Sequence, residues 1–224
     1  MIRALIFDFD GLLIDTETPA LTSWQKVYRD HGQTLTLELW QGAIGRASGT
    51  GFVPLDYLAT LIGNTFDVQS VREKRNEHKM QLCEAEQLRS GVLETLLKAK
   101  ELGLTCTVAS SAGREWVEGW LQKHDALHHF AFTRTGDDVE NVKPAPDLFL
   151  SVAEKLNLQP SECLVFEDSP NGALAALSAE MPCVFVTNPV TEGLEFPQHA
   201  LKLRRMDEMR LEHILQVIQG YRNE

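Results

Sequence analysis

The sequence lacks the features that would mark a membrane, exported or nucleic-acid-binding protein. Its 224 residues contain no apolar run long enough for a membrane span, and no basic, apolar and small-residue succession typical of an export signal. The formal net charge of -11 at pH 7 opposes binding to phosphate backbones and to anionic lipid surfaces. We therefore expect a cytoplasmic protein with neither nucleic acid nor membrane among its partners.

Closely spaced cysteines and nucleotide-binding glycine loops are also missing. None of the cysteines shows C-x-x-C spacing, and the last three fall in apolar runs, so we expect buried free thiols at Cys83, Cys106, Cys163 and Cys183. The sequence has no G-x-G-x-x-G motif and no Walker-type loop, which argues against nicotinamide dinucleotide and ATP sites of those types. It also has no internal repeat.

What the sequence does have is an apolar run that stops at acids, in the stretch LIFDFDGLLIDTE at residues 5–17. The run is typical of a buried strand, and it ends at Asp8, with Asp10 two residues further on. Two carboxylates about 4 Å apart repel by roughly 4 kcal/mol at an effective dielectric near 20, so a positive group is expected between them. Aspartates also end strands as turn formers or helix caps, so the other motifs of the chain are needed to choose between a catalytic and a structural role.

Helical patterns alone occupy the next seventy residues or so, and they predict helices over residues 18–31, 37–44, 53–62 and 68–86. From residue 91 helices and strands take turns, with helices predicted at 92–102, 116–123, 148–156, 173–179 and 206–218. The predicted strands are 104–109, 130–133, 163–166 and 183–186. This alternation indicates an α/β fold with a parallel sheet, and the helical block inserted after the first strand indicates a second, smaller domain.

Four of the predicted strands are followed by polar residues, and parallel sheets bind ligands at the carboxyl ends of their strands. These residues are Asp8 and Asp10, Ser110 and Ser111, Lys143, and Glu167 and Asp168. The acids offer only oxygen ligands, which suits Mg²⁺. A lysine adds a fixed positive charge and a serine a hydroxyl donor. The set would hold a phosphate whose phosphorus is attacked in line by a carboxylate.

Asp8 would be the attacking carboxylate and would form an aspartyl phosphate. Asp10 would protonate the leaving oxygen and then take a proton from the attacking water. Simpler interpretations stay open here. Lys143 could be a solvated loop lysine. The remaining strand-end residues could be helix caps, although a helix N-terminus that serine caps also favours phosphate.

Other polar and aromatic residues allow two interpretations or favour a structural one. Arg46 lies in the glycine-bearing segment GAIGRASGTG of the helical block, and it could contact the substrate or be a surface charge. The charges at residues 73–79 alternate in sign, which is typical of a solvated helix face. The tryptophans fall on helical faces and are interpreted as packing residues: Trp24, Trp40, Trp116 and Trp120.

Four segments, DFDGLLIDTE, VASSAGRE, KPAPDLF and FEDSPNGALAA, carry a resemblance to a known family. In this order and at these separations they resemble the four motifs of the haloacid dehalogenase superfamily, close to the beta-phosphoglucomutase-like phosphatases. The resemblance implies a Rossmann-like parallel-sheet core, made of residues 1–16 and 88–224, with an inserted helical cap domain at residues 17–87.

The resemblance also implies roles for the strand-end residues. Asp8 would be the nucleophile and Asp10 the acid and base, while Ser110 and Lys143 would bind the phosphoryl group. Mg²⁺ would be bound by Asp8, the backbone carbonyl of Asp10 and Asp168, with Glu167 next to the ion or one layer further out.

We therefore expect a monomeric, magnesium-dependent phosphatase that acts on a small phosphorylated metabolite, first of all a sugar phosphate. In the family's mutases a cap histidine handles the sugar hydroxyl, and Ala20 stands at that place here, which weakens a beta-phosphoglucomutase-type activity. A non-catalytic phosphometabolite sensor is the third alternative, although every residue needed for chemistry is present. Dehalogenation needs no metal and is disfavoured. The segment 179–182 replaces the family's usual glycine turn, which we expect to affect only a surface loop.

Overall fold

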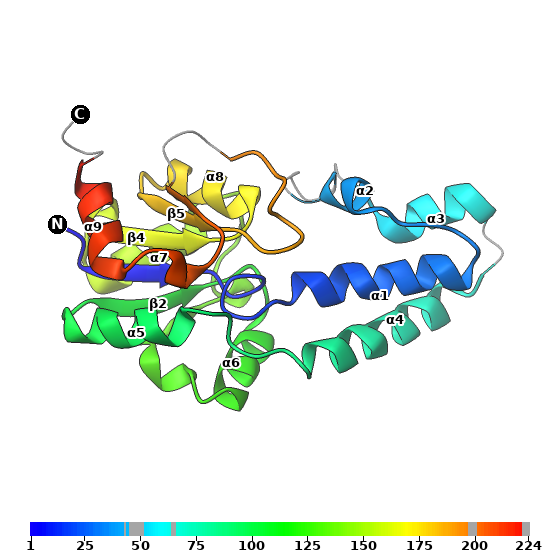
Figure 1. Ribbon diagram of the computed structural model, residues 1–224, viewed down its shortest axis with the longest axis horizontal. Coiled ribbons are helices and arrows are strands. Elements are labelled where there is room, and N and C mark those ends of the chain that lie inside the picture. Colours follow the sequence, from blue (N-terminus) through cyan, green and yellow to red (C-terminus); the bar gives the residue numbers. More distant parts are fainter. Residues whose placement is uncertain (43, 45–51, 64–65, 197–200, 221–224) are drawn as a thin grey trace.

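In the computed structural model, which describes residues 1–42, 44, 52–63, 66–196 and 201–220, one six-stranded sheet lies between helices (Figure 1). The strand order is β3-β2-β1-β4-β5-β6, and all neighbours run parallel. The strands are β1 (Ala4–Phe7), β2 (Thr105–Ala109), β3 (Thr133–Arg134), β4 (Cys163–Glu167), β5 (Cys183–Val186) and β6 (Leu201–Leu203). The predicted α/β fold is thus confirmed.

The strand order changes direction next to β1, because the chain first adds β2 and β3 on one side and then β4, β5 and β6 on the other. Such a switch point leaves a crevice at the carboxyl ends of the central strands. Phe7 pairs with Val108 of β2 and with Phe166 of β4, so the three central strands end at the same level. The residues that follow these strands therefore share one edge of the sheet.

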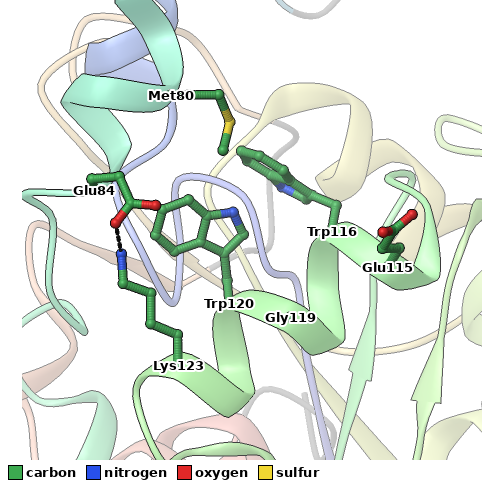
Figure 2. Close-up of a pocket in the computed structure, with 7 residues that line it drawn as sticks. All are labelled: Met80, Glu84, Glu115, Trp116, Gly119, Trp120 and Lys123. Atoms are coloured by element: carbon green, nitrogen blue, oxygen red, sulfur yellow. Dashed lines mark hydrogen bonds and ion pairs between the residues drawn. The ribbon is translucent and has the colours of Figure 1, made fainter. Parts of the chain in front are cut away.

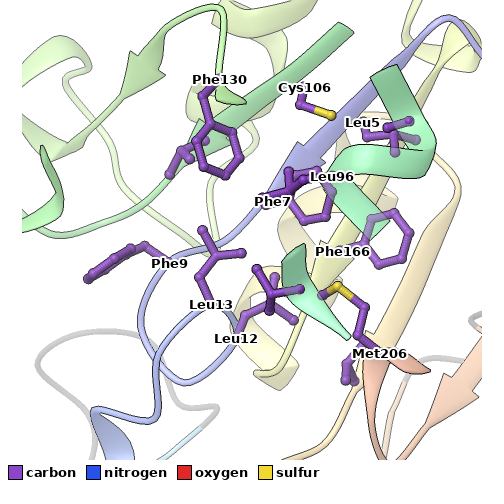
Figure 3. Close-up of a cluster of buried hydrophobic side chains, with 14 of the residues drawn as sticks. Leu5, Phe7, Phe9, Leu12, Leu13, Leu96, Cys106, Phe130, Phe166 and Met206 are labelled. Carbon is purple, nitrogen blue, oxygen red and sulfur yellow. The ribbon is translucent and has the colours of Figure 1, made fainter. Parts of the chain in front are cut away.

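The sheet is covered on both faces, which explains why its strands are continuous apolar runs. Side chains alternate along β1: Leu5 and Phe7 pack into one buried cluster, and Ala4 and Ile6 into a second one on the other face. Figure 3 shows the first cluster, in which the rings of Phe7 and Phe166 stack with centroids 5.0 Å apart. All four residues of β1 are fully buried.

The helices of the sheet region are α5 (Val92–Glu101), α6 (Arg114–Lys123), α7 (Asp147–Leu156), α8 (Pro170–Ser178) and α9 (Leu211–Gly220). Four further helices follow β1 and extend to one side of the sheet (Figure 1): α1 (Glu17–Asp30), α2 (Leu37–Gln41), α3 (Pro54–Ile62) and α4 (Val68–Cys83). These four pack around their own apolar cluster, which includes Tyr28, Leu58 and Val71. Val190, from the segment after β5, joins that cluster.

The chain leaves and re-enters the sheet region through two adjacent segments. Ile14 forms a bridge with Leu88, and the backbone N–H of Arg89 donates to the carbonyl of Leu13 over 2.9 Å. The predicted domain boundaries, after residue 16 and before residue 88, fall beside this pairing, and the division into core and cap stays a prediction. Among the described residues no helix is both long and apolar enough to cross a bilayer.

The structure differs from the sequence-based expectation mainly near the C-terminus. The edge strand β6 was not predicted, because three residues with a central lysine give too short a pattern. The last helix begins at Leu211 instead of residue 206. Residues 206–208 form a separate 3₁₀ turn that is held by a hydrogen bond from the Ser90 hydroxyl to Asp207. The third strand is shifted to Thr133–Arg134 and is only two residues long.

Candidate active site

The residues predicted from the strand ends come together at one edge of the sheet. Asp8 directly follows β1, Ser110 follows β2, Glu167 ends β4, and Lys143 reaches the same place from the segment between β3 and α7. A cavity of about 300 Å³ opens there. Its lining includes six of the predicted site residues: Asp8, Asp10, Ser110, Ser111, Lys143 and Asp168.

Lys143 is the positive group beside Asp8, but the second carboxylate that it contacts is Glu167 and not Asp10. Its Nζ lies 2.5 Å from Oδ1 of Asp8 and 2.5 Å from Oε1 of Glu167, and it also donates to the carbonyl of Ala109 over 2.8 Å. Burial of the ammonium opposes its charge, but attraction to both carboxylates outweighs this and raises the pKa of Lys143. The alternative of a solvated loop lysine is therefore wrong.

Three buried carboxylates lie close together, and Lys143 contacts two of them, Asp8 and Glu167. Asp8, Glu167 and Asp168 each offer an oxygen, and these oxygens lie within 4.8 Å of one another. Burial, and then repulsion within the cluster, raise the pKa of Asp8 and of Asp168 well above the usual range. The pKa values of Asp8 and Asp168 stay raised despite Lys143 and Arg89, so the fixed positive charge does not offset burial and repulsion, and the donor atoms are hard oxygens. The cluster therefore fits a divalent cation.

Glu167 organises the loop around it. Its Oε2 accepts from the backbone N–H groups of Asp168 and Ser169 over 3.0 and 3.1 Å, while Oε1 accepts from Lys143. The cap of α8 is neither of the two acids but Ser169, whose hydroxyl accepts from the N–H of Gly172 over 3.0 Å. A Cβ at Gly172 would lie 1.8 Å from Cδ of Glu167, so only glycine fits beside this carboxylate.

Asp168 is held by Asn188, a residue that the sequence analysis missed. Asn188 donates from Nδ2 to Oδ2 of Asp168 over 2.6 Å, and its Oδ1 accepts from the backbone N–H groups of Val190 and Thr191 over 2.9 and 3.0 Å. The polar pair Thr187–Asn188 after the strand 183–186 was a signal of the same kind as the other strand ends. Gly11 adopts φ +76, and a Cβ there would lie 2.1 Å from Oδ2 of Asp168.

Arg89 is a second missed residue. Its guanidinium donates to the carbonyls of Gly11 and Thr187, the latter over 2.5 Å, and so links the loop after β1 to the end of β5. Burial lowers the pKa of Arg89, partly offset by attraction to Asp168. No local sequence pattern distinguishes this arginine.

Asp10 is positioned from two directions. Its Oδ1 accepts from the hydroxyl of Thr16 over 2.7 Å and from the indole Nε1 of Trp116 over 2.9 Å. Interpreting Trp116 as a packing residue alone is therefore incomplete. The expected solvated face of α4 is also only partly correct, because half-buried Lys79 lies over the ring of Trp116 and half-buried Arg75 lies over the ring of Trp24.

Ser110 is buried and Ser111 is exposed at the cavity. The Ser110 hydroxyl accepts from the N–H of Ala112 over 3.1 Å. Neither serine caps α6, whose N-cap position is Gly113 without a side-chain hydrogen bond. Both serines therefore line the cavity beside the carboxylates, and their phosphate-binding role stays a prediction.

The last described wall of the cavity belongs to the helices after β1. Glu17, the first residue of α1, is half-buried there, and burial followed by the charge of Asp10 raises its pKa to about 7. Its position at the end of the DTE segment was not enough to single it out. Ile44 lines the same wall. Arg46, predicted as a substrate contact, lies outside the described residues.

Comparisons with known proteins identify the class that this fold and site define. The family of haloacid dehalogenase-like hydrolases matches residues 5–186, and the chain belongs to it. The chain is 43% identical over 215 residues to the Bacillus subtilis protein named "Putative phosphatase YhcW", covering 96% of this chain and 97% of that protein. It is 29% identical over 193 residues to the phosphorylated carbohydrates phosphatase of Thermotoga maritima, covering 85% and 88%.

The fold matches solved structures over the whole chain. A beta-phosphoglucomutase from Clostridium difficile superposes with a TM-score of 0.75 and 23% identity, covering 100% of both chains, which shows a shared fold. The sequence-based assignment to the haloacid dehalogenase superfamily is confirmed. The predicted enzyme class, a phosphoric monoester hydrolase, is confirmed as well.

Proposed function

We propose that this protein is a magnesium-dependent phosphatase that hydrolyses a small phosphorylated metabolite, first of all a sugar phosphate, through an aspartyl-phosphate intermediate on Asp8. The observation that carries the proposal is the buried arrangement of Asp8 between Lys143 and Asp168 in the floor of a cavity. A carboxylate beside an ammonium and a cation site can attack a phosphorus whose oxygens those charges hold.

In the first step an oxygen of Asp8 forms a bond to phosphorus while the bond from phosphorus to the substrate oxygen breaks. The released electron pair stays on the substrate oxygen, which takes a proton from the carboxyl group of Asp10, and the alcohol leaves. In the second step Asp10 accepts a proton from water as the water oxygen bonds to phosphorus. The bond from phosphorus to Asp8 then breaks and returns the carboxylate.

The metal site in this proposal consists of Asp8, the backbone carbonyl of Asp10, and Asp168. Mg²⁺ would supply a positive charge for the phosphoryl oxygens. Both oxygens of Glu167 already accept hydrogen bonds, which favours a place for Glu167 one layer behind the ion. Asn188 and Arg89 would keep Asp168 and the loop after β1 in position.

The substrate class rests on the other wall of the cavity. Glu17 places a carboxyl group there, and carboxylates accept hydrogen bonds from hydroxyl groups. The relative from Thermotoga maritima is named for phosphorylated carbohydrates. The helices after β1, residues 17–87, would act as a cap that sets specificity, since the strand ends recognise only phosphate.

Phosphatase activity is favoured over a mutase activity. A mutase must deprotonate a second hydroxyl and keep water from the phosphoenzyme. Ala20 is buried in α1, and no histidine lines the part of the cavity that the structure describes. Water should therefore be the acceptor.

The proposal is tested by measuring phosphate release from a panel of sugar phosphates and other small phosphate esters, with Mg²⁺ and with excess chelator. We expect hydrolysis of at least one sugar phosphate, loss of turnover in chelator, and recovery with Mg²⁺. Full activity in chelator after removal of bound metal would contradict the metal site. With beta-glucose 1-phosphate and a trace of the bisphosphate, glucose 6-phosphate forming faster than free phosphate would establish a mutase instead.

A further inference from the structure

We propose that Trp116 is a positioning residue for the proton transfer by Asp10: its indole N–H holds one carboxyl oxygen, so that the acid proton resides on the other. This inference rests on the proposed function, in which Asp10 is the acid and base. Trp116 belongs to α6 and lies outside the four motif segments.

The two donors to Asp10 share a single oxygen. Thr16 reaches Oδ1 over 2.7 Å and Trp116 reaches it over 2.9 Å. A hydroxyl can rotate and become an acceptor, whereas an indole N–H can only donate. The two donors occupy both lone pairs of Oδ1, so a proton there would have to oppose the Trp116 N–H or turn the Thr16 hydroxyl round, whereas a proton on Oδ2 leaves both hydrogen bonds intact. The neutral form of Asp10 therefore carries its proton on Oδ2.

The indole is itself held in place from both sides. Trp116 and Trp120 project from α6 into a groove of about 410 Å³ that Met80 of α4 lines on the other side (Figure 2). The two indoles meet edge to face, with centroids 5.5 Å apart. Nζ of Lys79, from α4, lies 4.9 Å from the centroid of the Trp116 ring, close enough for a cation–π contact. The helices after β1 thus contribute to the position of a group that touches Asp10.

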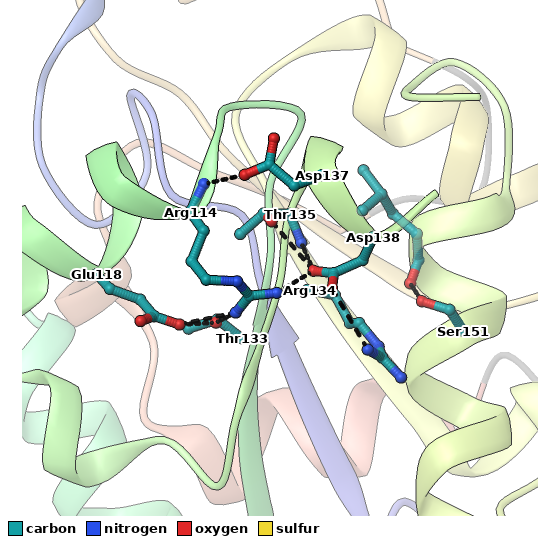
Figure 4. A network of polar contacts seen from close by, with 9 residues as sticks. Arg114, Glu118, Thr133, Arg134, Thr135, Asp137, Asp138 and Ser151 are labelled. Atoms are coloured by element: carbon teal, nitrogen blue, oxygen red, sulfur yellow. Dashed lines mark hydrogen bonds and ion pairs between the residues drawn. The ribbon is translucent and has the colours of Figure 1, made fainter. Parts of the chain in front are cut away.

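A polar network fixes the start of α6 relative to the sheet, as Figure 4 shows. The guanidinium of Arg114 donates to both oxygens of Asp138, over 2.6 and 2.5 Å, and to Thr133 over 2.9 Å. The backbone N–H of Arg114 donates to Asp137 over 2.8 Å. Because Trp116 lies only two residues further along, its ring is attached to a well-anchored turn.

The role of Trp116 predicts a dependence on the leaving group. A poor leaving group, such as a sugar alkoxide, needs the proton from Asp10 as its bond to phosphorus breaks, whereas a nitrophenolate leaves without one. Trp116→Phe keeps an aromatic ring but removes the donor. We expect kcat/KM for alkyl phosphates to fall about tenfold, a part of the 10²- to 10⁴-fold range of general acid catalysis, and kcat/KM for nitrophenyl phosphate to change less than about twofold.

The experiment measures kcat/KM for a series of phosphate monoesters that differ in leaving-group pKa, in wild type, Trp116→Phe, Trp120→Phe and Asp10→Asn. The parameter kcat/KM reports formation of the phosphoenzyme for every ester. Trp120→Phe is the matched control, because it removes an indole N–H from the same groove but keeps an aromatic ring against Trp116. We expect a steeper dependence on leaving-group pKa for Trp116→Phe, the steepest for Asp10→Asn, and the wild-type dependence for Trp120→Phe.

A uniform loss over all esters in Trp116→Phe would make Trp116 merely structural and overturn the inference. A wild-type dependence in Asp10→Asn would instead overturn the proposed role of Asp10, so the two failures are distinguishable. Should Trp116→Phe not fold, the hydrogen bond remains measurable in wild-type protein. The indole N–H resonance of Trp116, assigned by substituting the other three tryptophans, should move on Asp10→Ala. An unmoved resonance would contradict the inference.

Discussion

The two walls of the cavity are built differently. The strand-end wall is lined by the buried residues Asp8, Ser110, Lys143 and Asp168, and Glu167 lies behind them; the charged groups among them find their partners at neighbouring strand ends. The helical wall, represented by Glu17 and Ile44, is half-buried and comes from the segment after β1. A fixed wall suits a charge arrangement that must be the same for every phosphate ester, and the helical wall is free to differ with the substrate.

The largest effect is expected from the strand-end wall. Asp8→Asn removes the proposed nucleophile but keeps the size of the side chain, and an amide cannot form the phosphoenzyme. We expect phosphate release to fall at least about 10³-fold, as for other covalent nucleophiles, while the protein stays folded. Activity and circular dichroism measured on the same preparation test this. Turnover above a tenth of the wild-type value would remove Asp8 from its assigned role.

A second prediction concerns a substitution that disturbs the packing against Glu167, behind that wall. Gly172→Ala would place a Cβ 1.8 Å from the Glu167 carboxyl carbon, so the loop that holds Lys143 and Asp168 must shift. We expect a loss of about 2 to 4 kcal/mol in the free energy of unfolding, together with weaker metal binding. Urea denaturation measures the first and calorimetric titration the second.

Gly119→Ala is the matched control for this substitution. Gly119 also lies inside a helix, and a Cβ there meets nothing within 4 Å. Alanine is the better helix former, so this variant should be more stable by about 0.5 to 1 kcal/mol. Equal losses in both variants would mean that the contact with Glu167 has no special cost.

The strand-end wall was predictable from sequence because its signal is local. An apolar run followed by Asp8 or by Glu167 is visible within a few residues, and a parallel sheet brings such ends together. Lys143 follows the same logic, although its strand was placed a few residues early and proved only two residues long. The continuous apolar runs of the central strands predicted the sheet for the same reason, whereas the short edge strand β6 has no comparable run.

The partners of these residues were not predictable in the same way. Trp116 and Asp10 are 106 positions apart, and nothing in the pattern of α6 distinguishes an indole that packs from one that also donates. Lys79 and Arg75 lie on a helix whose alternating charges are typical of a solvated face, yet both are half-buried against tryptophan rings. Burial of a helix face depends on the tertiary arrangement, which outweighs the local pattern.

Metal binding should couple to protons at the strand-end wall. The raised pKa values of Asp8 and Asp168 mean that the metal-free protein keeps protons on this cluster where isolated carboxyls would have lost them. Mg²⁺ requires the carboxylates and therefore displaces protons, so its affinity should increase as the pH rises through the range in which Asp8 and Asp168 ionise. Calorimetric titrations in two buffers with different ionisation enthalpies measure the protons released. Binding without proton release would contradict the crowded, buried cluster.

The smallest effect is expected at the helical wall, where a substitution of Glu17 should raise the free energy of unfolding instead of lowering it. The pKa of Glu17 is raised from 4.5 to about 7, so its ionised form is disfavoured in the folded protein. Below pH 4.5 the carboxyl is protonated in both the folded and the unfolded state and contributes nothing. Between pH 4.5 and 7 the unfolded chain loses the proton first, so stability falls as the pH rises, and above pH 7 the whole penalty is present. Glu17→Gln removes it.

We therefore expect Glu17→Gln to be more stable than wild type by about 1 to 2 kcal/mol at pH 8, less than the full shift implies because the side chain is half-buried. At pH 4.5, where the unfolded carboxyl is half ionised, the difference should be at most about 0.4 kcal/mol. Urea denaturation in chelator at both pH values measures this without interference from bound metal. Glu77→Gln, the same substitution at an exposed position of α4, is the matched control. If Glu17→Gln were instead less stable at pH 8, the ionised carboxylate would be stabilised at this wall, and the contrast between the two walls would be lost.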